Sequence, residues 1–167
     1  MGLIEYTFDG VAMMPLDTAD TNRFKARETA GTNVNRIFHW TDDSTAYRGH
    51  KRFIIPVDID ASGTVTFGAA GVPQISGGTN LAWRFAHSPI AHGEDHDVAY
   101  SNVDSGDFAM PSTADDLVFV EWTETVANLG WSAHDLVYFY IERITAGASP
   151  ATTENTLDVF RISIPTA

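Results

Sequence analysis

The sequence has no cysteine, few basic residues and no long apolar run, and each absence excludes a class of protein. Without cysteine, disulfide frameworks, thiolate nucleophiles and cysteine zinc sites are all excluded. Only 10 residues are Lys or Arg against 22 Asp or Glu, which gives a formal net charge of −12. Nucleic acids and anionic membranes bind proteins mainly through basic residues, so we expect neither as a partner. No apolar run approaches the roughly 20 residues of a membrane-spanning helix.

The few basic residues are unevenly placed. Residues 1–60 hold seven basic and nine acidic residues, whereas residues 61–167 hold three basic and thirteen acidic ones. All seven basic residues of the first part lie between Arg23 and Arg52. Two interpretations stay open for this stretch: an ordinary solvated surface, or a basic segment that docks on an acidic partner such as a neighbouring copy of the chain.

The dominant pattern is a series of short segments in which apolar and polar residues alternate, separated by turn-forming residues. No stretch keeps apolar residues at helical spacing over three turns. The pattern predicts an all-β fold, an antiparallel β-sandwich, with seven strands near residues 34–40, 52–59, 63–69, 81–87, 117–126, 136–144 and 157–164. Two further short segments, Tyr6–Phe8 and Val11–Met14, would raise the number of strands to nine.

The first 33 residues lack a lasting period, and Thr29–Asn33 has the composition of a flexible joint. The sequence therefore predicts an extended N-terminal arm at residues 1–33, followed by the sandwich domain at 34–167. The arm is either a loose terminus or a segment that lies against this or another subunit. In the second case its contact residues are Ile4, Tyr6, Phe8, Met13, Met14, Arg23, Lys25 and Arg27.

Two of the predicted strands carry apolar residues on both faces. Leu117 and Phe119 lie opposite the face that continues to Trp122, and Tyr138 and Tyr140 lie opposite the core-type face of their strand. A sandwich strand needs only one buried face, so something must cover the other. A long loop, the N-terminal arm or a neighbouring subunit would serve. Because aromatic residues suit subunit interfaces, we expect a homo-oligomer.

The segment His87–Asp97 holds three histidines and three carboxylates, which are common metal ligands. Their spacing does not support a site, because His92 and His96 flank Gly93 in a predicted loop rather than share a helix face. The alternating acids and central glycine of a full calcium loop are also missing. We predict a solvated acidic loop and no metal.

Catalytic patterns are equally weak. Glu121, Glu124 and Glu142 could pair across a cleft as in a glycosidase, but on strands they are more typical of outward surface charges. No serine lies in a nucleophile turn, and no glycine-rich segment has the lysine and the setting of a phosphate loop. We predict no enzyme activity and no cofactor.

Four segments carry a family resemblance. The segments are Phe53–Ile59 with Gly63–Phe67, Leu81–Phe85, Leu129–Arg143 and Asn155–Ile162. They follow the order of a strand, a Gly-rich turn, a Trp-centred strand, a long acidic loop and two closing strands. This order, over about residues 34–164, resembles a β-sandwich family found in bacteriophage structural genes. In that family the residue before Asp135 is usually Gly, where this chain has His134, and the same segment ends in an arginine, matched by Arg143.

The resemblance implies a jelly-roll-like virion protein without catalytic residues, on the capsid exterior or an appendage. The implied roles are a head decoration (cement) protein or a collar or tail-appendage module. The implied partners are other copies, with a trimer favoured by analogy with jelly-roll cement proteins, and the major capsid protein or another virion subunit. A carbohydrate-binding sandwich of a tail fibre is the alternative, with Trp122 or Trp131 exposed as a platform for a sugar ring.

Overall fold

The computed structural model describes residues 2–9, 27–28, 34–35, 38–40, 48–71, 80–110, 117–144, 146–148 and 155–167. Almost all of the regular structure in these residues is β-strand, and one helix of a single turn interrupts it. The elements are β1 (Gly2–Asp9), β2 (Arg27–Glu28), β3 (Val34–Asn35), β4 (Phe38–Trp40), β5 (Arg48–Ile54), β6 (Thr64–Gly71), β7 (Asn80–Ile90), β8 (Ser101–Asp104), β9 (Phe108–Ala109), β10 (Val118–Thr125), α1 (Val126–Leu129), β11 (Leu136–Ile144), β12 (Asn155–Leu157) and β13 (Val159–Thr166).

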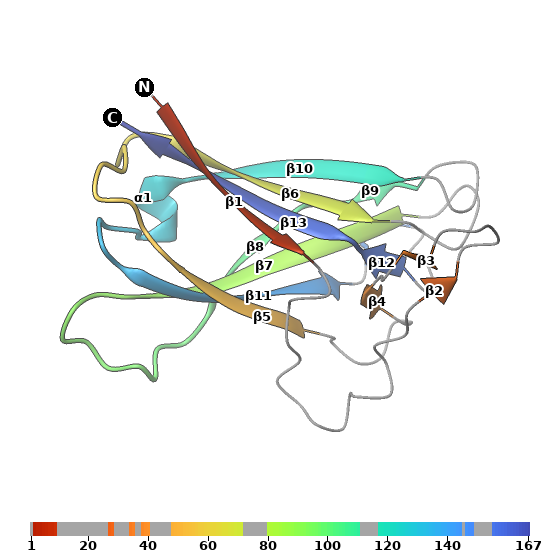
Figure 1. The fold of residues 1–167 in the computed structure, drawn as a ribbon, viewed down its shortest axis with the longest axis horizontal. Coiled ribbons are helices and arrows are strands. Elements are labelled where there is room, and N and C mark those ends of the chain that lie inside the picture. Colours follow the sequence, from red (N-terminus) through yellow and green to blue (C-terminus); the bar gives the residue numbers. More distant parts are fainter. Residues whose placement is uncertain are drawn as a thin grey trace.

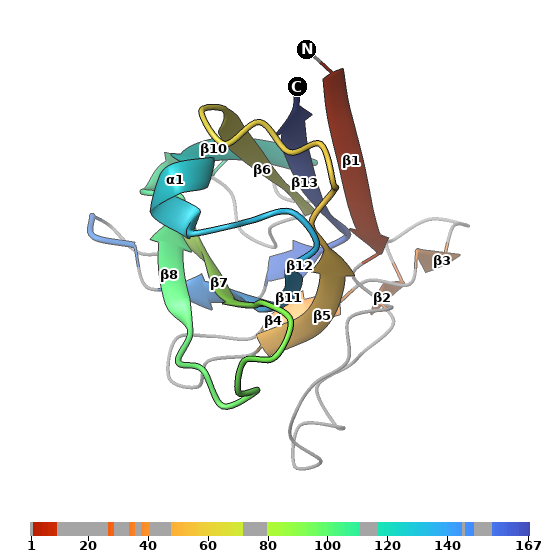
Figure 2. The same cartoon turned by 90° about the vertical axis from the view of Figure 1, so that its left-hand side faces the viewer.

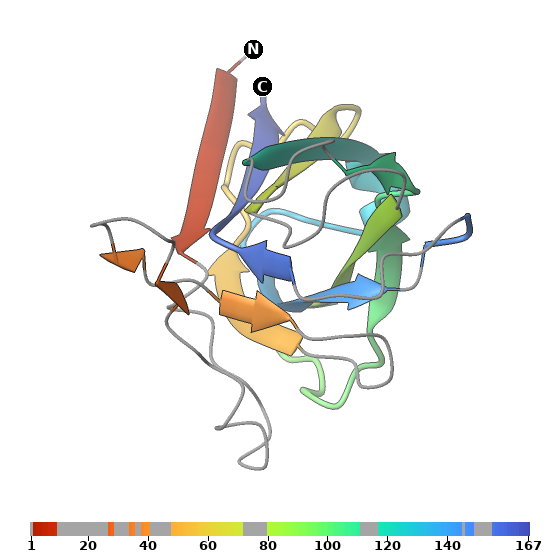
Figure 3. The same ribbon diagram turned by 90° about the vertical axis from the view of Figure 1, so that its right-hand side faces the viewer.

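Two antiparallel sheets face each other (Figures 1 and 2). Sheet A has the strand order β1-β13-β6-β10, and sheet B has the order β5-β11-β7-β8, with β9 also pairing with β7. Figure 2 looks along the strands, with sheet A above sheet B. The short pair β4 and β12 lies at the end of the sandwich that faces the viewer in Figure 3. The structure confirms the all-β sandwich that the alternating segments predict.

The path of the chain through these sheets is that of a jelly roll. Along the eight strands of the two main paths, the chain crosses from one sheet to the other at every connection except the one from β7 to β8. The first and last of these strands are neighbours in sheet A, and the second and second-last are neighbours in sheet B. This nested order is the double-sheet jelly-roll arrangement.

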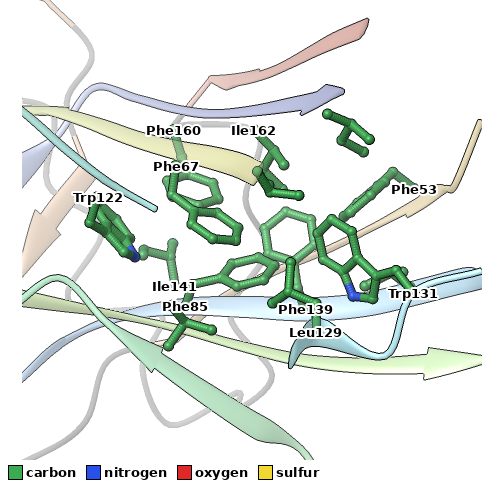
Figure 4. Close-up of a cluster of buried hydrophobic side chains, with 14 of the residues drawn as sticks. Phe53, Phe67, Phe85, Trp122, Leu129, Trp131, Phe139, Ile141, Phe160 and Ile162 are labelled. Carbon is green, nitrogen blue, oxygen red and sulfur yellow. The ribbon is translucent and has the colours of Figure 1, made fainter. Parts of the chain in front are cut away.

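Alternating side chains explain why the two sheets pack. In β11, Val137, Phe139 and Ile141 point into the sandwich and are fully buried, while the residues between them face outward. β13 and β6 contribute the facing layer, and Phe67 and Phe85 meet at 4.5 Å between ring centroids. Figure 4 shows this aromatic core. Burying each such side chain stabilises the fold by roughly 2 kcal/mol.

The first strand differs from the predicted arm. Gly2–Asp9 pairs with β13 over its whole length, from Gly2 opposite Thr166 to Asp9 opposite Val159. The rings of Tyr6 and Phe8 pack on the core, because alternate residues of an edge strand point inward. These residues therefore belong to the sandwich, and the rest of the predicted arm lies outside the described residues except for β2.

Other differences occur where single residues override the pattern. Pro56 follows the end of β5, so Val57 lies exposed in a turn instead of continuing the predicted strand. β8 and β9 lie between the predicted strands at 81–87 and 117–126, where the sequence pattern predicts no strand. No helix among the described residues has the length and apolar character that a membrane crossing requires.

His134 occupies a position that favours glycine. Its backbone φ is 70°, a left-handed conformation that no other non-glycine residue of the described chain adopts. Its amide donates to the Ile55 carbonyl, and the Asp135 carbonyl accepts from the Ile55 amide, so the turn fixes β5 against the start of β11. A glycine at this position would adopt this φ without strain.

Candidate functional site

Both tryptophans considered as a sugar platform are buried inside the sandwich. Trp122 is 7% exposed and Trp131 is 4% exposed, and both belong to the aromatic core. Trp131 packs edge-on against Phe53 and its Nε1 donates a hydrogen bond to Nδ1 of His87 at 3.2 Å. The stacking platform expected for a carbohydrate-binding protein is therefore absent at these two positions.

The histidine-rich segment does not form one site. His87 is 2% exposed and lies in the core beside Phe85 and Trp131, where burial lowers its pKa to about 4. His92 and His96 lie in the exposed β7–β8 loop, residues 91–100. Within the described ranges, no group of three or more metal-ligating side chains comes together.

The three strand carboxylates, for which a glycosidase-like pair was the less typical interpretation, lie in different places. Glu121 faces outward from sheet A and pairs with Arg161. Glu124 accepts hydrogen bonds from the Thr125 backbone amide and from the Asn128 side-chain amide. These bonds lower the pKa of Glu124, the Thr125 bond more than the Asn128 bond. Glu142 lies on the opposite sheet. Glu142 therefore does not share a sheet face with Glu121 or Glu124.

The outer face of sheet A carries exposed apolar residues next to the ion pairs that Arg161 forms with Glu5 and Glu121. Leu117 is 67% exposed and Phe119 is 52% exposed. The Phe119 ring covers Gly68, where an added Cβ would lie 3.0 Å from it, and the Arg161 guanidinium lies 5.2 Å from the ring centroid. Arg161 also pairs with Glu5 at 3.5 Å. The second face predicted for β10 is therefore present, and it is open among the described residues.

On the outer face of sheet B, each outward residue of β11 lies between its paired residues on β5 and β7, and these sets of three form rows across the sheet. Tyr138 lies between Arg52 and Ser88, and the next row of this face places Tyr140 between His50 and Ala86. Tyr140 is only 6% exposed, so the second face predicted for β11 is largely covered by the chain itself. Burial raises the pKa of the Tyr140 hydroxyl, with the Glu142 carboxylate as the next cause.

A buried carboxylate lies in the last row of this face. Glu142 is 3% exposed and sits between two arginines, Arg48 at 3.0 Å and Arg84 at 3.5 Å. Arg84 also forms two hydrogen bonds to Asp104, which raise the pKa of its guanidinium above the usual range. The Arg48 guanidinium lies 4.4 Å from the Tyr140 ring centroid. Through these contacts the Glu142 carboxylate links β11 to β5 and to β7.

The β7–β8 loop folds over part of sheet B. The Tyr100 ring lies 5.0 Å from the Tyr140 ring, and the His96 ring lies 6.3 Å from the Tyr138 ring. Ser88 Oγ also donates to the Val98 carbonyl at 3.3 Å. On the other side of Tyr140, burial and then Arg48 lower the pKa of His50 to about 4. This loop is the cover that the tyrosine face requires.

Only some of the predicted arm residues lie among the described residues, and these lie in β1 or β2. Tyr6 and Phe8 are half-buried and contact the Phe53 ring, and the Tyr6 hydroxyl donates to the Ile54 carbonyl at 2.7 Å. Ile4 lies on the same inward face. Arg27 is in β2, and nothing is described of its side chain. Met13, Met14, Arg23 and Lys25 lie outside the described residues.

Sequence reasoning missed the ion cluster on sheet B. Glu142 and Arg84 can be recognised in the sequence as polar residues within predicted strands, but their pairing depends on the register of neighbouring strands. The prediction of a solvated loop was wrong for His87, which lies in β7 and is buried. The signal was present in the sequence, because His87 continues the inward series of Leu81, Trp83 and Phe85 at a period of two.

Comparisons with known proteins give a distant structural likeness. No protein-family model matches the sequence, and a search of curated proteins finds no match. A solved structure titled as that of infectious bursal disease virus, Gx strain, resembles the chain with 9% identity and a TM-score of 0.45. The likeness covers 100% of this chain and 34% of that one, so this chain spans about a third of its length. At that distance it carries no argument about function.

Proposed function

We propose that this chain is a non-enzymatic virion structural protein, a decoration (cement) protein that binds the outside of a capsid. The observation that carries the proposal is the jelly roll whose two outer faces hold apolar and aromatic residues. The phage-family resemblance of residues 34–164 points to the same class.

The outer faces suit attachment. Leu117 and Phe119 offer apolar area on sheet A, and a surface that combines exposed apolar and charged residues is typical of protein interfaces. The net charge of −12 keeps a protein made in many copies soluble before it binds. The partner is the major capsid protein or another virion subunit, and other copies of the chain complete the lattice.

A particle assay tests this function. Particles purified from cells that carry the gene should contain this chain in fixed ratio to the major capsid protein in a mass-spectrometric inventory. Mild chaotrope should release it and leave intact shells, and added protein should rebind. The variant Phe119→Ser should rebind more weakly than the variant Thr64→Ser, which changes an exposed residue near the far end of sheet A. Absence of the chain from particles would refute the proposal.

The basic segment has a separate test. Neutralising Arg23, Lys25 and Arg27 should weaken rebinding mainly at low salt, where surface charge is least screened. A deletion for the same purpose should begin after Asp9, because removing β1 would take an edge strand from sheet A. Unchanged rebinding of the neutralised variant at low salt would assign attachment to the sheet faces alone.

A further inference from the structure

The outer face of sheet B carries opposite charges on its two halves. One half is the edge strand β5, which among the described residues pairs only with β11. The other half is the β7–β8 loop with β8 and the residues after it. On this face the β5 half has two basic residues and no carboxylate, namely Arg48 and Arg52. Lys51 lies on the other side of the strand, in register with Phe139. The other half has no Lys or Arg and holds Glu94, Asp95, Asp97, Asp104 and Asp107.

Internal pairing neutralises only part of these charges. Arg48 is paired with Glu142, and Asp104 is paired with Arg84. Within the described ranges, no carboxylate lies within ion-pair distance of Arg52, and Glu94 and Asp95 bind only backbone amides of their own loop. Each half therefore keeps charge that nothing described in the chain satisfies.

Exposed apolar side chains accompany the charge on both halves. Ile54 is 57% exposed at the end of β5, next to Arg52. On the acidic side, Val98 is 40% exposed and Tyr100 is 41% exposed. Three of the seven exposed large apolar residues of the described chain thus lie on these two half-faces. A mixture of apolar area and complementary charge favours a specific interface over a merely solvated surface.

We propose that the basic half of this face, centred on Arg52 and Ile54, binds the acidic half, centred on Asp97 and Tyr100, of a second copy of this chain. The proposal deepens the proposed function, because it assigns the contact through which copies associate. The occupant follows from charge complementarity, since the chain itself supplies an acidic surface with matching apolar residues. Sheet A does not offer the same contact, because its Arg161 is already paired with Glu5 and Glu121.

The geometry of such a contact limits the assembly. The two halves are different surfaces, so two arrangements satisfy both. Two copies related by a two-fold axis form the contact twice in one isologous interface, which gives a dimer, whereas a heterologous head-to-tail contact closes as a ring of three or more copies. In both, every copy uses each half once.

Charge reversal tests the contact. The variants Arg52→Glu and Asp97→Lys each reverse one exposed charge that no described ion pair uses. The matched control for Arg52→Glu is the double variant Thr7→Glu/Thr123→Glu, which makes the same change in net charge on the outer face of sheet A. Molar mass is measured by light scattering after size exclusion over a concentration series, at about 50 mM and about 500 mM salt.

We expect the wild type and the control to associate at low salt, and each charge-reversal variant to need at least about tenfold more protein for the same association. An equimolar mixture of the two variants should recover association, because the reversed halves are complementary again. Association of either variant like the wild type, a mixture no better than its components, or a monomeric wild type would overturn the proposal. These results are independent of the particle inventory, which tests the proposed function by itself.

Discussion

The outer faces of the two sheets use similar residues to different effect. On sheet A, Arg161 bridges Glu5 and Glu121, and the side chains of these acids are 50% and 47% exposed. On sheet B, the side chain of Glu142 is 4% exposed between Arg48 and Arg84. Solvated ion pairs contribute little to stability, whereas a buried carboxylate depends on its partners. What an outward-facing carboxylate contributes to stability therefore depends on whether other parts of the chain shield it from solvent, and not on the residue type.

The largest difference in stability between the two faces should appear when the Glu142 carboxylate is removed. Glu142→Ala removes the partner of Arg48 and one of the two partners of Arg84, and we expect it to lower the free energy of unfolding by about 2 to 3 kcal/mol, because hydrogen bonds to a buried charged group are lost while the guanidiniums stay partly solvated. Glu121→Ala on sheet A should change it by about 0.5 kcal/mol or less. Urea unfolding at neutral pH measures both. Equal losses would show that the two ion clusters are equally solvated.

Acid should act through sheet B, because the four strands of sheet A contain no histidine. Burial lowers the pKa of His87 from 6.5 to about 4, so between these pH values the unfolded chain binds the proton that the folded chain rejects. Stability is therefore complete above pH 6.5 and falls as pH decreases toward 4, by roughly 3 kcal/mol from this residue.

Urea midpoints measured between pH 7 and pH 4 check this dependence, where the range is set by the ordinary and lowered pKa values of about 6.5 and 4. His87→Gln should flatten the profile while its amide oxygen still accepts from Trp131. His50, whose pKa is also lowered to about 4, accounts for a remaining slope. A wild-type profile that stays level down to pH 4 would contradict the burial of His87.

A smaller effect should follow from the exposed aromatic residue on sheet A. Phe119→Ala removes the ring that covers Gly68 and receives Arg161, and we expect a loss of about 1 kcal/mol. Leu117→Ala, at a more exposed neighbouring position, should cost less than about 0.5 kcal/mol. Thermal unfolding of the two variants measures the difference. A loss at Phe119 as large as that of Glu142→Ala would mean that sheet A is covered as well.

The smallest expected effect is a gain. His134→Gly removes a left-handed φ of 70° from a side-chain-bearing residue, and we expect about 0.5 kcal/mol of added stability after the entropy cost of glycine. His134→Ala, which keeps the strain, is the matched control and should not stabilise. Since the turn positions β5 against β11, the gain should appear as slower local opening of sheet B in hydrogen exchange, with sheet A unchanged.

The sequence was sufficient for the sandwich but not for the surfaces. The predicted strand at 136–144 is β11 residue for residue, because apolar alternation identifies a buried face directly. β1 was assigned to an arm, since an edge strand with one half-buried face has a weak pattern, and β8 was missed because it is four residues long and polar. The cover of Tyr140 by Tyr100 needed the path of a loop, which alternation does not encode.

The pairing of β1 with β13 has a mechanical consequence. Gly2 is opposite Thr166, so the two ends of the described chain leave the molecule side by side (Figure 1). A pulling force applied to these two ends acts perpendicular to the strands β1 and β13. The hydrogen bonds between the two strands are therefore loaded one after another, starting at Gly2 and Thr166. The strands should peel apart at low force, in the manner of a zipper. A load carried through the faces of the sheets would instead leave this seam unstressed.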